Sequence, residues 1–386
     1  RGRARGRLMR ILHLAYEDPR RPGGGGGSVR TLEVDRRLAR RHDVTAVVAA
    51  YPGAREQTSD GIRWLPIGPR RAGRLPQLAW FALAGLEARR QDADIVIEDF
   101  GAPFSVAMSP LLTDRPVVAC VQWLFAREMR AKYGLPFDAV ESLGLRAYDD
   151  FVVVSDWLAG AVRRRRPEAR VETIPNGVPA SAFTVPRADP EHLLFLGRLD
   201  RAQKGLDLLA TIATELRDRL GSRMPPLLVA GDGSDRRWFE EVVQERGLRD
   251  IVRMEGRVGG ERKARLLSAA HAVIMPSRFE TFGMVAAEAE AAAVPLVAFD
   301  IGPLRDVAGP PAILVEPFRT DRFADEVATY VRDPRRRDEA GDAGRAWARR
   351  YDWDAIADAV EAHLERSLEA WRLRRERREA TGTAAR

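Results

Sequence analysis

The feature that most constrains this chain is a regular alternation of short apolar runs with helical patterns along nearly its whole length. The apolar runs are rich in Val, Ile and Leu and are continuous, which is typical of strands buried on both faces of a parallel sheet. Each run is followed by a stretch with helical periodicity. The pattern therefore predicts an α/β protein built from doubly wound sheets, with helices covering both faces.

The alternation occurs in two blocks, separated by a Pro-containing stretch at 179–191. The first block has predicted strands at 10–15, 44–49, 94–98, 117–122, 151–155 and 171–175. The second has predicted strands at 192–197, 227–231, 251–255, 271–276, 295–299 and 312–315. We expect two Rossmann-like domains, 9–180 and 190–350, facing each other across a cleft. A final helix at 351–378 is expected to cross back toward the N-terminal domain, before a disordered polar tail.

Composition excludes several classes of protein. A chain of 386 residues with 45% hydrophobic and 31% charged residues is typical of a globular protein with two domains. The single cysteine, Cys120, excludes an internal disulfide framework. No run approaches the roughly 20 apolar residues of a membrane span, and 75–88 is predicted to be a core helix. The apolar run after the basic start is too short for a signal peptide, so we expect a cytoplasmic protein.

The net charge of +7 raises the question of an anionic partner. The basic residues are interspersed with Asp and Glu, without aromatic interleaving or a nucleic-acid motif, so no nucleic-acid partner is predicted. A weak peripheral attraction to anionic lipid is left open through the basic run Arg163 to Arg166.

The loops that follow the predicted strands are where ligands bind in such sheets. The loop after the first strand contains five consecutive glycines, Gly23 to Gly27, before a helix. Glycines allow close approach to a ligand, and the helix start offers N–H groups to an anion, so Gly26 and Gly27 are predicted to contact a donor. A flexible surface loop would have the same composition.

In the second block, the stretch 197-GRLDRAQKGLDLL-209 places Arg198 and Lys204 on a strand-to-helix loop that begins at Gly197. Two cations beside a helix start can hold a diphosphate through charge-assisted hydrogen bonds. The backbone near Gly256 and Val258, after a further strand, is predicted to contact a flat base.

The stretch 276-PSRFETFGMVAAEAEAAAVPLVAFD-300 carries three Glu residues between a turn and the next strand. The helix start at Thr281, Phe282, Gly283 and Met284 offers N–H groups to the same diphosphate. Glu280 would then lie toward a sugar, and Glu288 toward the two hydroxyls of a ribose. Such carboxylates would also complement a helix dipole. Their combination with the two cations favours a nucleotide-sugar site.

These residues closely resemble family 4 of the retaining GT-B glycosyltransferases. The resemblance covers nearly the whole chain and is strongest from about 190 to 316. Glu280 and Glu288 match the family's E-x₇-E pattern, and Asn176 with Gly177 matches its N-G element. The segment 351-YDWDAI-356 looks like its C-terminal aromatic signature. The G-R-L-x-x-x-K-G element is matched by Gly197, Arg198, Leu199, Lys204 and Gly205.

The resemblance implies transfer of a sugar from a nucleotide-diphosphate donor to a small-molecule or glycan acceptor, with retention of configuration and without a cofactor or bound metal. It implies that Arg198, Lys204 and helix N–H groups neutralise the leaving diphosphate. It also implies that Glu280 holds sugar hydroxyls and that Glu288 holds the ribose.

The N-terminal half departs from the family's pattern. Gln122 stands where the family often has a His, and a loop that usually contains His offers Glu98 and Asp99 instead. Thr281 replaces a frequent Gly. An acidic acceptor pocket would favour a cationic acceptor such as an amino sugar. The acceptor-side candidates are Glu98, Asp99, Gln122, Glu128 and Asn176.

Two other classes of function are left open. A sugar-nucleotide epimerase of the same fold would share the donor site but would need acid–base residues at the sugar, and this chain is poor in His there. His13 is the one histidine expected near the cleft, and it is more simply interpreted as a strand residue. A non-catalytic nucleotide-binding partner of another transferase would also keep the donor site. An epimerase would convert a nucleotide sugar with no acceptor present.

Overall fold

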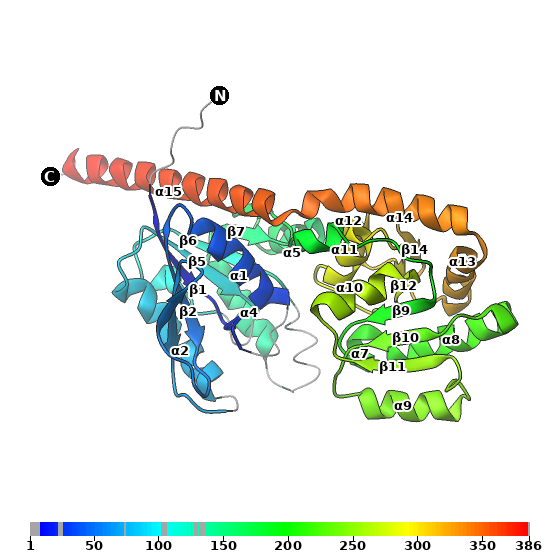
Figure 1. Ribbon diagram of the computed structural model, residues 1–386. Helices are drawn as coiled ribbons and strands as arrows, with labels where there is room; N and C mark the ends of the chain where they lie inside the picture. Colours follow the sequence, from blue (N-terminus) through cyan, green and yellow to red (C-terminus); the bar gives the residue numbers. More distant parts are fainter. Residues whose placement is uncertain are drawn as a thin grey trace. The chain divides into compact units, whose positions relative to one another are not determined.

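The structure is a computed structural model that describes residues 8–21, 26–72, 75–101, 106–124, 126, 130, 134 and 136–384. The chain divides into two compact units. The first unit runs up to Asn176 and also includes the residues from Trp353 onward, and the second unit is Gly177–Asp352. Each unit contains its own sheet, covered by helices (Figure 1). Two Rossmann-like α/β domains were predicted from the sequence, and the structure confirms them.

The sheet of the first unit has the order β3-β4-β2-β1-β5-β6-β7-β8, and all its neighbours are parallel except β3 and β4. All six predicted strands are present, and β3 and β4 were not predicted. These two form a hairpin whose turn residues Asp60 and Gly61 both have positive φ. An Asp-Gly pair is a strong hairpin signal that could have found them. The strands are β1 (Arg10–Leu14), β2 (Asp43–Ala49), β3 (Gln57–Ser59), β4 (Ile62–Ile67), β5 (Ile95–Phe100), β6 (Val117–Val121), β7 (Asp150–Val153) and β8 (Arg170–Thr173).

The helices of the first unit include one from the far end of the chain. They are α1 (Gly26–Leu38), α2 (Leu75–Arg90), α4 (Phe137–Ala147), α5 (Asp156–Arg165) and α15 (Trp353–Ala384), with the short 3₁₀ helix η1 (Ser109–Leu111). Helix α15 packs against α1 (Figure 1). It adds five buried apolar side chains to the core of the first unit: Trp353, Ile356, Val360, Leu364 and Leu368.

Polar contacts also hold α15 against the other elements of the first unit. Arg37 donates to the Asp354 carboxylate at 2.6 Å, and the His42 ring lies 3.0 Å from the Glu361 carboxylate. The tail beyond 378, expected to be disordered, continues as helix to Ala384. An ion pair between Arg375 and Glu379, one helical turn apart, favours this extension.

The second unit has a fully parallel sheet in the order β11-β10-β9-β12-β13-β14. All six strands predicted for this half are present. Since chain order runs outward from β9 in both directions, the order reverses between β9 and β12, where Rossmann-like sheets bind their ligands. The strands are β9 (His192–Leu196), β10 (Leu227–Ala230), β11 (Val252–Gly256), β12 (Ala270–Met275), β13 (Leu296–Phe299) and β14 (Ile313–Val315).

Helices cover both faces of this second sheet (Figure 1). A core of buried Leu, Ile, Val, Phe and Ala side chains lies between the strands and helices such as α8 and α13. The helices are α6 (Ala180–Phe183), α7 (Arg201–Lys204), α8 (Leu206–Leu220), α9 (Arg236–Glu245), α10 (Gly260–Ser268), α11 (Met284–Ala291), α12 (Gly302–Ala308), α13 (Thr320–Arg332) and α14 (Pro334–Ala348), with the 3₁₀ helices η2 (Gly221–Arg223) and η3 (Arg349–Tyr351).

The chain passes between the units within the predicted aromatic signature at 351–356. Tyr351 belongs to the second unit, where its hydroxyl donates to the Val307 carbonyl at 2.8 Å and its ring packs on Phe282. Trp353, two residues later, is buried in the core of the first unit. The two crossings lie at 176/177 and 352/353, so the Pro-containing stretch expected as the linker lies inside the second unit.

Candidate active site

Two loops of the second unit meet where the strand order reverses. One follows β9 and carries Arg198 and Lys204, and the other follows β12 and carries Glu280. Strands β9 and β12 are parallel neighbours, so their carboxyl ends lie side by side. The fold therefore brings residues about 80 positions apart in the sequence to one edge of the sheet.

The backbone fixes the position of Lys204. It ends the short helix α7, which is capped at its start by Asp200, whose side chain accepts from the Gln203 N–H. Gly205 follows with φ of 66°, and a Cβ atom there would lie 2.1 Å from the Pro276 carbonyl oxygen. Only glycine allows this approach of the two loops. The Arg278 N–H also donates to the Gln203 carbonyl at 2.8 Å, so the two loops are joined beside Lys204.

Lys204 and Glu280 form an ion pair at this edge. The Lys204 ammonium lies 2.5 Å from Glu280 Oε1, and the Ser277 hydroxyl donates to the same oxygen at 2.8 Å. Glu280 is 5% exposed. Ser277 was not predicted as a site residue, although it sits in the quoted turn three residues before Glu280.

Arg198 lies on the surface of the same loop. Its guanidinium donates to the Gln203 side chain at 2.6 Å. Its side chain is exposed, so the guanidinium is accessible to an anion from solvent. Arg198 lies before α7 and Lys204 at its end, and their role in holding a diphosphate stays a prediction.

The start of helix α11 has the geometry expected of an anion site. Gly283 precedes the helix with φ of 92°, and a Cβ atom there would lie 2.5 Å from Leu304 Cδ2. No side chain caps this helix start, so its first N–H groups, at Met284 and beyond, are not used by a cap. Thr281 is partly exposed. Phe282 is buried against the Tyr351 ring, so its side chain anchors the turn and only its backbone can face a ligand.

Glu288 lies on α11 itself, about one turn after the helix start, and also pairs with a lysine. Its Oε2 is 2.5 Å from the ammonium of Lys263, and Glu288 is 8% exposed. Lys263 lies on α10, which begins just after the loop that contains Gly256 and Val258. Lys263 was missed in the sequence analysis, because only the fold shows that α10 lies beside α11.

The predicted base-binding residues lie at the end of β11. The Gly256 carbonyl accepts from the Gly231 N–H at 2.7 Å, and Val258 is partly exposed in the following loop. Strand β11 is two strands from β9 in the sheet. Gly256 and Val258 thus lie on the same edge as Lys204, on the side away from β12.

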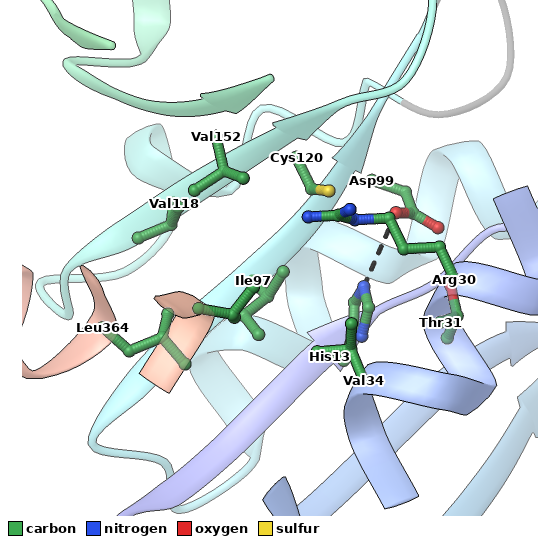
Figure 2. A pocket seen from close by; sticks show the side chains of 11 residues that line it. His13, Arg30, Thr31, Val34, Ile97, Asp99, Val118, Cys120, Val152 and Leu364 are labelled. Atoms are coloured by element: carbon green, nitrogen blue, oxygen red, sulfur yellow. Dashed lines mark ion pairs between the residues drawn. The ribbon is translucent and has the colours of Figure 1, made fainter. Parts of the chain in front are cut away.

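The first unit contains a buried charged cluster at the carboxyl ends of its strands. His13 Nδ1 lies 2.8 Å from Asp35, and His13 Nε2 lies 3.5 Å from Asp99. Figure 2 shows His13, Arg30, Asp99 and Cys120 around one small cavity, with the His13–Asp99 ion pair dashed. Burial alone would lower the pKa of His13, but the carboxylates of Asp35 and Asp99 raise it well above its ordinary value. The His13 ring is therefore held between two carboxylates inside the first unit.

Four acceptor-side or donor-loop candidates, Gly26, Gly27, Gln122 and Asn176, lie on or around α1. Gln122 Nε2 donates to the Gly27 carbonyl at 3.4 Å, so the residue that stands in place of a family His touches the glycine-containing helix start. Gly26 is the first residue of α1. Arg30 donates to Asn176 Oδ1 at 3.1 Å, and Asn176 is buried.

The acidic acceptor pocket expected from the sequence is not present as a set of free carboxylates. Glu98 is fully buried and accepts from the Tyr148 hydroxyl at 2.5 Å, the Ala107 N–H at 2.6 Å and the Ser109 hydroxyl. Burial raises the pKa of Glu98, and the hydrogen bonds from Ser109 and Tyr148 oppose this rise. Glu98 thus anchors the segment at 107–109. Asp99 has its charge balanced by His13, and Glu128 lies outside the described residues.

Two further features concern the part of the chain that the structure describes. No group of three or more His, Cys, Asp or Glu side chains in that part of the chain is arranged to hold a metal ion. None of the helices described is both long and apolar enough to cross a bilayer.

Similarity to known proteins identifies the family of this chain. The family model "Glycosyl transferases group 1" matches residues 181–347, and "Glycosyltransferase Family 4" matches residues 24–182. The alpha-D-kanosaminyltransferase of Streptomyces kanamyceticus is 32% identical over 60% of this chain and 56% of its own length. The D-inositol 3-phosphate glycosyltransferase of Xylanimonas cellulosilytica is 29% identical over 92% of this chain and 94% of its own length.

Other curated relatives, such as the glycogen synthase of Mycobacterium tuberculosis, match over about half of their length. Among solved structures, the sucrose-phosphate synthase of Thermosynechococcus elongatus superposes with a TM-score of 0.77 at 20% identity, covering 94% of this chain and 100% of that one. This likeness shows the fold. With adjoining family matches from residue 24 to residue 347, the chain belongs to the family 4 glycosyltransferases of the GT-B fold.

Proposed function

We propose that this glycosyltransferase moves a sugar from a nucleoside-diphosphate donor to a small-molecule or glycan acceptor, with retention of anomeric configuration and without a bound metal. The observation that carries the proposal is the Lys204–Glu280 ion pair at the point where the strand order of the second sheet reverses. A cation and a carboxylate adjoin there beside an uncapped helix start. These are the groups that a sugar diphosphate needs at its leaving oxygen and at its hydroxyls.

The diphosphate would be held by Arg198, Lys204 and the first N–H groups of α11. When a diphosphate arrives, it replaces Glu280 as the partner of Lys204, because its oxygens carry more negative charge than one carboxylate. Glu280 is then free to accept hydrogen bonds from sugar hydroxyls. The two cations lower the charge of the leaving group in the transition state, a task that a metal ion performs in other enzymes.

The nucleoside would lie on the other side of the diphosphate. Glu288 would accept from the two ribose hydroxyls, since a carboxylate can accept two such bonds. Lys263 holds that carboxylate in place at 2.5 Å in the free protein. The backbone near Gly256 and Val258 would contact the base.

Retention would follow from attack of the acceptor on the face that the diphosphate leaves, with a phosphate oxygen taking the acceptor proton. This route needs no carboxylate nucleophile, so Glu280 can serve only to accept hydrogen bonds from the sugar hydroxyls. The anomeric configuration of the product, measured by its proton coupling constant, tests it. An inverted product would contradict this route.

Thermal stabilisation by a panel of nucleoside diphosphates and their sugars tests the donor site. We expect one base to raise the melting temperature of the full chain, and we expect Lys204→Ala and Glu288→Ala to abolish the rise. Arg237→Ala, an exposed residue on α9, is a matched control that should keep it. If no nucleotide stabilises the protein, the donor site is refuted and a non-catalytic role is favoured. Conversion of the donor without acceptor would instead indicate an epimerase.

A further inference from the structure

Helix α2 turns an apolar stripe to solvent, which is unusual for a surface helix of a globular protein. Leu75, Leu78, Phe81 and Leu83 are 57%, 51%, 37% and 39% exposed. Ala82 and Leu86 continue the face that begins with Leu75 and Leu78, because successive members of this series are three or four residues apart. The stripe therefore runs along most of the helix.

The opposite face of α2 is already packed in the first unit. Trp80 is fully buried and its indole N–H donates to the Val47 carbonyl at 3.2 Å. Ala84 and Gly85 are buried as well. A core helix was predicted at 75–88 from the sequence, but only one face of α2 is buried. Since its inner face already fills the core, the outer leucines are not a missing part of it.

A second element extends the apolar stripe. Leu111 and Leu112, in and after the 3₁₀ helix η1, are 69% and 39% exposed. Leu112 lies against α2, because a Cβ atom on Gly85 would be 2.7 Å from its Cδ1. The α2 patch is defined here as Leu75, Leu78, Phe81, Leu83, Leu111 and Leu112.

The α2 patch has basic residues at both ends of the helix. Arg70 and Arg71 precede the helix, and Arg89 and Arg90 end it, and all four are exposed. The only acidic residue of the helix, Glu87, is buried on the inner side and pairs with Arg90 at 3.1 Å. The outward face of α2 is therefore apolar with a cationic border.

We propose that the α2 patch binds the surface of an anionic lipid bilayer, with α2 lying in the interface. Leucine and phenylalanine on one face, bordered by arginines, are the composition of helices that lie in the headgroup region. A second copy of this chain is the less suitable occupant, because it would bring Arg70, Arg71 and Arg89 against identical cations. Anionic headgroups neutralise the same residues.

This surface replaces the basic run Arg163 to Arg166 as the candidate for lipid contact. Arg163 donates to the Val171 carbonyl, Arg165 pairs with Glu141, and Arg166 pairs with Asp149. Three of the four arginines are thus engaged within the first unit. The apolar side chains Leu158, Ala159 and Val162 of α5 are buried, and Trp157 is the single large apolar side chain that this helix exposes, so α5 has no apolar stripe like that of α2.

Co-sedimentation of the full chain with vesicles tests the proposal. The vesicles are phosphatidylcholine alone, or equal parts of phosphatidylcholine and phosphatidylglycerol, at low and at high salt. We expect binding to the anionic vesicles that weakens with salt. The variant Leu75→Gln/Leu78→Gln/Phe81→Gln should reduce the partition coefficient at least about tenfold. Arg70→Glu/Arg71→Glu should reduce it at least about thirtyfold, which corresponds to about 1 kcal/mol for each of the two cations lost from the anionic surface.

Leu373→Gln is the matched control, since Leu373 is a leucine on α15 that is 50% exposed. It should bind like the unmodified protein. An unchanged melting temperature of each variant shows that the fold is intact, because the substituted side chains lie at the surface. Absence of binding to anionic vesicles, or equal binding by the triple-glutamine variant, overturns the proposal. Self-association that this variant abolishes, without lipid binding, also overturns it in favour of a dimer surface.

Discussion

Each unit of the molecule buries carboxylates at the carboxyl ends of its strands, but their partners differ. In the first unit, Glu98 accepts from hydroxyl and backbone N–H groups, and Asp35 pairs with the buried His13 ring. In the second unit, Glu280 and Glu288 each pair with a lysine at 2.5 Å. The four carboxylates are similarly buried, at 0% to 8% exposure.

Under the proposed function, it is the partner that separates a structural carboxylate from one that a ligand can engage. Hydroxyl, backbone and imidazole donors in the first unit are held by the surrounding core, so their bonds to Glu98 and Asp35 cannot be exchanged without local unfolding. A lysine ammonium ends a flexible side chain and can turn to a stronger anion. Burial alone would have assigned all four carboxylates the same role.

The largest expected effect is on catalysis, from Lys204→Ala. If Lys204 stabilises the leaving diphosphate, its removal should lower kcat/KM by about 10²- to 10³-fold, as loss of one electrostatic group in other active sites does. Steady-state kinetics with the donor found in the thermal screen measures it. Lys263→Ala serves as the comparison and should mainly raise KM. Equal loss in kcat for both lysines would remove the distinction between them.

The next largest effect is on stability, from Asp35→Asn. Removing one partner of a buried ion pair leaves His13 without its counter-charge, so the free energy of unfolding should fall by about 3 kcal/mol. Urea denaturation followed by tryptophan fluorescence of the first unit measures it. Asp354→Asn is the control, since the Asp354 side chain is 66% exposed and its pair with Arg37 should contribute less than about 1 kcal/mol. Similar losses in both variants would contradict the structural role of Asp35.

The variant Glu98→Gln distinguishes a structural role of Glu98 from a role in binding the sugar acceptor. It disturbs a buried acceptor of several hydrogen bonds, so the free energy of unfolding should fall by about 1–3 kcal/mol. KM for the acceptor should stay unchanged in the protein that remains folded. A raised acceptor KM at unchanged stability would restore Glu98 as an acceptor residue.

Glu288→Gln should weaken donor binding about tenfold, the effect of losing roughly 1.4 kcal/mol from charge-assisted bonds to the ribose. Calorimetric titration with the nucleoside diphosphate measures the change in Kd. A 2′-deoxy nucleotide should show a smaller difference between the two proteins. Equal weakening for both nucleotides would mean that Glu288 acts elsewhere.

The smallest expected effect is a gradual change with pH in the free energy of unfolding of the first unit. The neighbouring carboxylates raise the pKa of folded His13 above its ordinary value of 6.5, despite burial. Its contribution to stability is therefore complete below 6.5 and is lost as pH rises through the folded pKa. Urea denaturation across this range should show stability falling with rising pH, and His13→Gln should flatten the dependence. Stability that rises with pH in this range would contradict the sign.

The sequence predicted the second unit more completely than the first. Continuous apolar runs identified all six of its strands, and the motif residues sit directly at strand ends, where topology alone brings them together. In the first unit, β3 and β4 were missed because Gln57–Ser59 is short and polar, and because Pro66 interrupts the strand pattern of β4.

Side-chain direction and partners across the fold were beyond the sequence analysis. Glu98 and Asp99 are adjacent on β5, so their side chains point to opposite faces of the sheet. Both were predicted to face one pocket, and an alternation argument would have separated them. Lys263 has no motif of its own, and its role depends on α10 lying next to α11. In the sequence, the exposed leucines of α2 cannot be told apart from leucines of a core. Only the fold shows which face of the helix is covered.

The discontinuous first unit has a consequence for how the protein is made. Five core side chains of that unit, from Trp353 to Leu368, are the last part of its core to leave the ribosome. The second unit is one continuous stretch, so it can fold while the first still lacks one wall of its core. A released chain that ends at Asp352 should therefore contain a protease-resistant second unit and a protease-sensitive first one. Translation of the last helix, rather than of the first domain, would then complete the enzyme.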